Sequence, residues 1–202
     1  MSLPGAIVED RLTMPISERD HIRGRLAAPM TLVEYGDYEC AHCGLAHPII
    51  NTVRQHFARQ LRFVFRHFPL SQVHPNAEAA AESAEFAGAH GRFWEMHDGI
   101  YENQDQLGLP LLFALAGTFG LSESDLRNAL ASGEYAPKVR ADFLGGVRSG
   151  VNGTPLMARA TTERMSSTSS SRPSICGSSA GRRCNGGPAC RTGAPRQAAL
   201  LI

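Results

Sequence analysis

The sequence predicts an α/β fold, and three observations lead to that prediction. Residues 30–36 form an apolar run rich in β-formers, which is typical of a buried strand. Residues 61–67 alternate apolar and polar side chains and predict a second strand. From residue 74 to residue 148 the periodicity is helical. We therefore expect a strand, a helix, a second strand and then a block of helices.

The helix between the two strands is expected over residues 41–59. Its signal is a set of apolar residues four positions apart, which lie on one helical face: Leu45, Ile49, Val53 and Phe57. A helical crossover of this length makes the two strands parallel. The helices expected after the second strand span 75–90, 91–103, 109–119, 122–131 and 135–148.

Composition narrows the classes of protein to consider. The chain has 202 residues, 43% hydrophobic residues and a formal net charge of +1, which suits one domain with an insertion or two small domains. This near-neutral charge gives no sign of a nucleic-acid partner. No apolar run reaches the roughly 18 residues that a membrane span needs. The N-terminus lacks the pattern of a secretory signal, so we expect a cytoplasmic protein.

The motif that points to chemistry is Cys40-Ala41-His42-Cys43, directly after the first strand and at the start of the predicted helix. At a helix N-terminus, unpaired N–H groups and the macrodipole favour a thiolate over a thiol. A thiolate with a second thiol one turn away is suited to thiol–disulfide exchange. The alternative is half of a structural zinc site. No second C-x-x-C exists, so the sequence favours redox chemistry with no metal and no other cofactor.

Six further segments appear in a fixed order and together resemble the DsbA-like family of thioredoxin-fold oxidoreductases. The similarity is to members without a signal sequence, a type also found fused to sodium/proton antiporters. The resemblance implies a thioredoxin-like fold in which the helical block, about residues 74–148, is an insertion that caps the active site. The matching segments are ERDHIRG (18–24), VEYGDYEC (33–40), FRHFPL (65–70), HPNA (74–77), FWEMHD (93–98) and GVNGTP (150–155).

The resemblance implies a role for each residue near the motif. Cys40 would be the exposed attacking thiolate, and Cys43 the buried thiol that resolves the mixed disulfide. His42 would stabilise the Cys40 thiolate, although an exposed residue without a role is the alternative. Glu34 lies on the buried strand, where its pKa should rise, so it could take the proton from Cys43. The alternative for Glu34 is a partly exposed carboxylate without a catalytic role.

A second implied element is Thr154-Pro155, which resembles the cis-proline loop that faces the C-x-x-C motif in thioredoxin folds. It would bind the extended backbone of a substrate. Protein thiols and disulfides are therefore the expected partners. The competing hypothesis is a non-catalytic module of the same fold that binds peptides or regulates a transporter.

The end of the chain departs from the family. After residue 157 the sequence is rich in Ser, Arg and Gly, and it lacks the final strands and helix that the family implies. Read two bases later, codons allowed by residues 156–176 can encode a hairpin turn and an amphipathic helix, so we infer a reading-frame change near Pro155. A genuine disordered tail is the alternative. The sequence therefore predicts an N-terminal segment (1–29), a redox domain (30–157) and a disordered tail (158–202).

Overall fold

The computed structural model describes residues 8–9, 12 and 14–161. They belong to one compact unit, Met1–Arg164, and a second unit, Met165–Ile202, lies outside the described residues. Residues 162–202, which are most of the tail expected over 158–202, also lie outside the described residues. The hypothesis of a reading-frame change therefore stays a prediction, which the nucleotide sequence of the gene would test.

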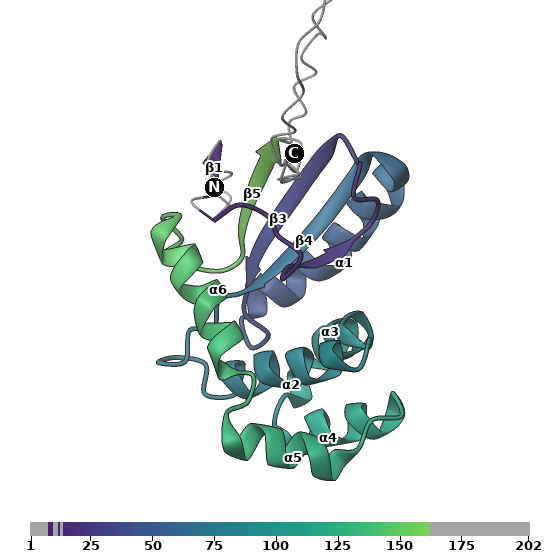
Figure 1. Ribbon diagram of the computed structural model, residues 1–202, viewed down its shortest axis with the longest axis vertical. Coiled ribbons are helices and arrows are strands. Elements are labelled where there is room, and N and C mark those ends of the chain that lie inside the picture. Colours follow the sequence, from purple (N-terminus) through teal and green to yellow (C-terminus); the bar gives the residue numbers. More distant parts are fainter. Residues whose placement is uncertain (1–7, 10–11, 13, 162–202) are drawn as a thin grey trace, which may run out of the picture. The chain divides into compact units, whose positions relative to one another are not determined.

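The described unit is a mixed sheet with helices packed against it (Figure 1). Each strand and helix expected between residues 30 and 148 is present, with its ends within two residues of the predicted ones. The elements in chain order are β1 Val8–Glu9, β2 His21–Arg23, β3 Met30–Gly36, α1 Ala41–Phe57, η1 Ala58–Gln60, β4 Leu61–His67, α2 Ala77–Ala89, α3 Phe93–Glu102, η2 Gln104–Gln106, α4 Leu109–Thr118, α5 Glu123–Ser132, α6 Ala136–Arg148 and β5 Leu156–Thr161.

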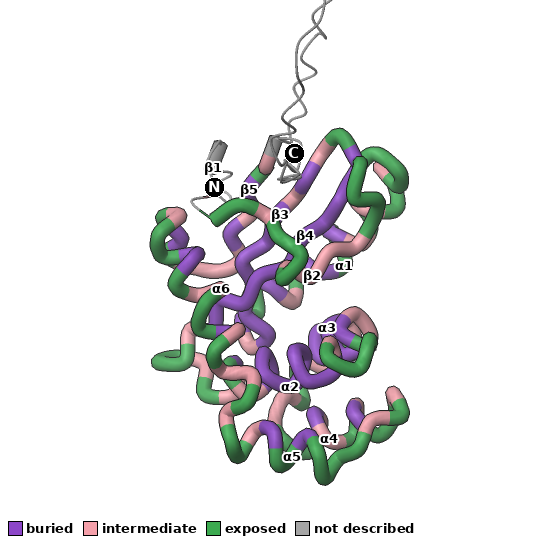
Figure 2. Tube along the Cα trace, in the orientation of Figure 1, coloured by how far each residue is buried: buried purple, intermediate pink, exposed green. Residues whose placement is uncertain are grey.

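The sheet has the strand order β1-β5-β3-β4-β2. β3 and β4 are parallel, as the helical crossover predicts, and Gly36 lies opposite His67 at their ends. β5 runs antiparallel to β3, and β2 runs antiparallel to β4. Because β3 and β4 lie inside the sheet, they are among the most buried segments (Figure 2). The short strands β1 and β2 carry no periodic signal and were not predicted.

Alternate residues of the strands face two separate hydrophobic cores. Phe63 and Phe65 pack on one side with α1 and the helical block. Val33 and Val64 pack on the other side, together with Phe143 of α6 and other apolar side chains. The sheet is therefore covered by α1 on one face and by α6 on the other, and Cys40 and Cys43 belong to the first core.

Helix α1 forms as predicted, but its expected apolar face is not the buried one. Leu45 is 70% exposed and Ile49 is 60% exposed. The residues that α1 buries are Cys43, His47 and Ile50, which are also spaced three and four apart. The face of α1 that packs against the core therefore carries a thiol and an imidazole in place of two aliphatic side chains. This packing leaves Leu45 and Ile49 of the helix exposed to solvent.

Strand β5 crosses the boundary that the sequence predicted between residues 157 and 158. It continues to Thr161, with Ala158 opposite Val33 and Ala160 opposite Thr31. Leu156 and Ala158 are buried in the core under α6. Backbone pairing with β3 and two small or apolar side chains are thus enough to place these residues in the sheet. The first residues after the expected boundary are therefore strand.

Candidate active site

The turn between β3 and α1 is organised by the buried side chain of Asp37. Its carboxylate accepts hydrogen bonds from the N–H groups of Glu39 and Leu70, each at 2.8 Å. His74 Nδ1 lies 2.7 Å from the same carboxylate. Three hydrogen bonds compensate the cost of burying the charge. Asp37 thereby fixes the start of α1 and ties the segment after β4 to it.

Cys40 is the residue that caps the N-terminus of α1. Both Cys40 and Cys43 are free thiols, 6% and 0% exposed. The expectation of an exposed Cys40 is therefore wrong. The reason is the loop before β5, since the Cys40 Sγ lies 3.4 Å from the Thr154 carbonyl oxygen.

The environment of Cys40 favours its thiolate. A hydrogen bond from the Cys43 side chain is the largest cause, and it lowers the pKa of Cys40 to about 4. Burial opposes this shift, while the Thr154 side chain and the backbone N–H groups of Cys43 and His42 reinforce it. These backbone donors are the unpaired N–H groups of the first helical turn, as the sequence argument expected.

Cys43 has the opposite behaviour. The hydrogen bond that it gives to Cys40 and its complete burial raise the pKa of Cys43 far above that of an ordinary thiol. The backbone N–H of Asp37 points at its sulfur, at 3.5 Å. The pair therefore consists of one thiolate and one protonated thiol, and the proton of Cys43 has to be removed before it can attack.

Glu34 is a carboxyl group buried beneath this pair. It is 2% exposed and lies on β3 between Phe65 of β4 and Met157 of β5. Burial, with a smaller contribution from the charge on Cys40, raises the pKa of Glu34 to about 8. The prediction that a buried Glu34 has a raised pKa agrees with the structure, and the alternative of a partly exposed carboxylate does not.

His42 and His74 lie in different surroundings. The His42 side chain is exposed on the first turn of α1. His74 forms an ion pair with the buried Asp37. Although burial opposes it, Asp37 raises the pKa of His74, with a further contribution from the charge on Cys40. The sequence did contain a signal for Asp37, because it is an acidic residue between a buried strand and the C-x-x-C motif. We did not use that signal.

Thr154 and Pro155 lie at the same end of the sheet as Cys40. The peptide bond between them is cis. Leu156 pairs with Tyr35, so the loop reaches the sheet beside the end of β3. Thr154 Oγ1 is buried and has no hydrogen-bond partner among the residues that the structure describes. Its hydroxyl is thus available to the Cys40 sulfur, which the Thr154 carbonyl already contacts.

Two groups of side chains within the described residues have the geometry to hold a metal ion, and neither includes a cysteine. One consists of His47, His97 and Asp98. There, Arg23 makes two hydrogen bonds to Asp98, which occupies the carboxylate with another cation. The other consists of His21, His67 and Glu85. It lies outside the cysteine pair and is treated separately below.

Two comparisons by sequence place this geometry in context. A family model described as Thioredoxin matches residues 17–159, more than half of the chain. The chain is 43% identical over 145 residues to "Na(+)/H(+) antiporter NhaA 1" of Salinispora arenicola, a match that covers 71% of this chain and 22% of that protein. The chain is also 41% identical over 145 residues to "Na(+)/H(+) antiporter NhaA 3" of Salinispora tropica, and this match covers 71% of this chain and 22% of that protein. The chain thus spans about a fifth of these relatives.

No helix among the described residues is long and apolar enough to cross a membrane.

Solved structures with the same fold include BdbD from Bacillus subtilis, with a TM-score of 0.66 and 22% identity over 72% of this chain and 83% of that one. Wolbachia pipientis alpha-DsbA1 also has a TM-score of 0.66, with 20% identity over 75% of this chain and 79% of that one. The described residues therefore share the overall fold of these structures. The chain belongs to the thioredoxin family and has the DsbA-like form of its fold, with a helical insertion.

Proposed function

We propose that the protein is a thiol–disulfide oxidoreductase that acts on protein thiols and disulfides. The observation that carries this proposal is the opposite ionisation of two adjacent thiols. The pKa of Cys40 is lowered to about 4, and the pKa of Cys43 is raised. A thiolate is the nucleophile in disulfide exchange, and the protonated neighbour does not compete with it.

In the reductive direction the Cys40 thiolate attacks one sulfur of a substrate disulfide. The substrate disulfide bond breaks, the second substrate sulfur leaves as a thiolate, and a mixed disulfide with Cys40 forms. Cys43 then loses its proton and attacks the Cys40 sulfur. The first substrate sulfur leaves, and the enzyme keeps a Cys40–Cys43 disulfide. Two electrons have passed to the substrate, and the oxidative direction is the reverse.

Glu34 is the group that we assign to the proton of Cys43. Its charge raises the pKa of Cys43, so the two groups interact electrostatically. With its own pKa near 8, the carboxyl group can both accept and release a proton near neutral pH. His42 contributes its backbone N–H to the Cys40 thiolate. A role for its exposed imidazole stays a prediction.

Thr154 and Pro155 are the proposed substrate-binding residues. The Thr154 carbonyl lies within 3.4 Å of the Cys40 sulfur, so a substrate chain bound along this loop would bring its own disulfide to that sulfur. Backbone recognition of this type accepts many sequences. Proteins that carry accessible disulfides or thiols are therefore the proposed partners, and we propose a cytoplasmic location.

Replacing Cys40 with serine tests the proposal. We expect reduction of the insulin disulfides by dithiothreitol to lose its catalysis by about 10³-fold or more, because the nucleophile is gone. Cys176, Cys184 and Cys190 should be serine in every protein compared, so that no other thiol contributes. Unchanged activity in the Cys40→Ser protein would contradict the proposal.

A second candidate is a non-catalytic peptide-binding or transporter-associated module. The observation in its favour is that two curated relatives of this chain are named as antiporters, and the matching part is about a fifth of their length. The same Cys40→Ser protein separates the two functions. If neither the wild-type nor the Cys40→Ser protein reduced disulfides, and both bound an extended peptide, the result would favour the non-catalytic module.

A further inference from the structure

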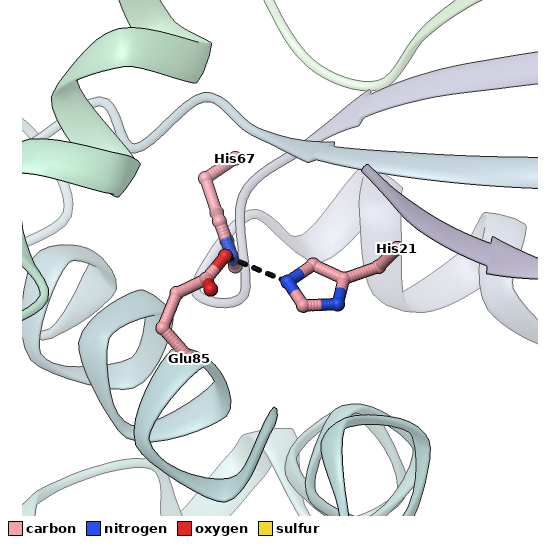
Figure 3. A group of neighbouring side chains, drawn as sticks. All are labelled: His21, His67 and Glu85. Atoms are coloured by element: carbon pink, nitrogen blue, oxygen red, sulfur yellow. Dashed lines mark hydrogen bonds and ion pairs between the residues drawn. The ribbon is translucent and has the colours of Figure 1, made fainter. Parts of the chain in front are cut away.

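Three side chains from distant parts of the sequence converge outside the cysteine pair (Figure 3). His21 lies on β2, His67 ends β4, and Glu85 lies on α2. Nε2 of His21 is 2.8 Å from Oε1 of Glu85, and Nε2 of His67 is 2.9 Å from the same oxygen. Two imidazole nitrogens therefore converge on one carboxylate oxygen, and the three atoms lie within 4.8 Å of one another.

The centre is enclosed on most sides. The side chains of His67 and Glu85 are 1% and 8% exposed, and that of His21 is 18% exposed. The Phe93 ring is stacked on His21, and it makes an edge-to-face contact with His67. Such surroundings exclude most water and strengthen electrostatic interactions. His21 is the side from which an ion could enter.

The charges around the centre leave it slightly negative. Lys138 Nζ is 3.4 Å from Glu85 Oε1 and 2.6 Å from Asp142 Oδ2. Asp142 also accepts a hydrogen bond from the backbone N–H of His67. With neutral imidazoles, two carboxylates and one ammonium group leave one net negative charge. Because its shorter contact is with Asp142, Lys138 keeps a partner if a cation binds Glu85.

We propose that His21, His67 and Glu85 form a binding site for a zinc-like divalent cation. Two histidines and one glutamate form a common zinc ligand set that leaves the fourth position to water. Ligands at about 2.0–2.1 Å from a tetrahedral ion are a little over 3 Å apart, so small movements suffice. His67 Nδ1 is buried without a partner in the described part of the chain, so no neighbour prevents its proton from moving there.

The site has a consequence beyond disulfide exchange. An ion at this centre would join β2, β4 and the first helix of the insertion, and so would hold the helical block to the sheet. A ligand that binds only the folded state raises its stability by mass action. Zinc binding would therefore stabilise the packing of the helical block against the sheet.

The test is titration of the full chain with Zn²⁺ by calorimetry, together with thermal unfolding with and without the ion. We expect one site, and a higher unfolding temperature when zinc is present. His21→Gln and Glu85→Gln should each weaken binding by more than about tenfold, because each removes a ligand. His90→Gln is the matched control, since His90 is an exposed histidine at the end of the same helix as Glu85.

A second variant keeps the test valid even if a ligand substitution prevents folding. Lys138→Met removes the competing ammonium group and should tighten zinc binding by at least about tenfold. Co²⁺ as a spectroscopic probe then identifies the donors, because thiolate ligands add strong sulfur-to-cobalt absorption in the near ultraviolet. Sulfur absorption, no binding by the folded wild-type protein, or equal affinities of the His21→Gln and His90→Gln proteins would each overturn the proposal.

Discussion

Replacing Cys43 with serine should convert the protein into one that accumulates a covalent complex with its substrate. Cys40 keeps its thiolate-favouring helix position, so the first exchange step proceeds. The resolving sulfur is absent, so the mixed disulfide persists until an external thiol cleaves it. Steady-state turnover should fall by about 10³-fold or more, while nearly all of the protein becomes coupled to a disulfide-containing peptide. Non-reducing electrophoresis and intact-mass measurement detect the complex.

The Cys40→Ser protein is the control for this experiment, and it should form no complex. The hydrogen bond from Cys43 is the largest cause of the lowered pKa of Cys40. A serine hydroxyl can donate the same hydrogen bond, which makes Cys43→Ser a better choice than Cys43→Ala. A Cys43→Ser protein that turns over normally would show that Cys43 does not resolve the intermediate.

Replacing Glu34 with glutamine should change the pH dependence of stability. The folded carboxyl group keeps its proton up to a pKa of about 8, whereas the unfolded one ionises near 4.5. Between these values the folded state binds more protons, so Glu34 lowers the free energy of unfolding as pH rises. Relative to wild type, the Glu34→Gln protein should gain about 5 kcal/mol across this window. The lowered pKa of Cys40 acts in the opposite sense in both proteins, so the difference between their urea-unfolding free energies is the quantity to measure.

The same substitution should slow resolution of the mixed disulfide by about 10²-fold, since Cys43 loses its proton acceptor. Rapid quenching of single-turnover reactions measures this step. Glu82→Gln is a matched control, because Glu82 is a buried glutamate of α2 outside the cysteine pair, and its resolution rate should equal that of wild type. A flat stability difference together with an unchanged resolution rate would remove Glu34 from the mechanism.

Most of the fold could be predicted because its central elements have strong periodic signals. β3 and β4 are short runs of apolar and β-forming residues, and the helices from α2 to α6 repeat apolar residues at helical spacing. β2 has only three residues, which is too short for a periodic signal. Its place in the sheet comes from its pairing with β4. The buried face of α1 was mispredicted because Cys43 and His47 replace aliphatic residues in the core.

The site could be predicted only where one motif contains the chemistry. Cys40 and Cys43 are three positions apart in the sequence, and Glu34 lies on the strand that precedes them. The pairing of Asp37 with His74 depends on a turn after β4, and the burial of Cys40 depends on the Thr154 loop. His21, His67 and Glu85 come from three elements, so no local spacing brings them together. Tertiary packing decides such contacts.

The most direct test is the rate at which iodoacetamide alkylates Cys40 as pH is varied, with Cys176, Cys184 and Cys190 replaced by serine. The lowered pKa predicts a rate that reaches half of its plateau near pH 4 and stays high through neutral pH. Cys43 should react slowly under the same conditions, since it is buried and protonated. A half-maximal rate near pH 8.5, the value of an ordinary thiol, would contradict the proposed oxidoreductase activity.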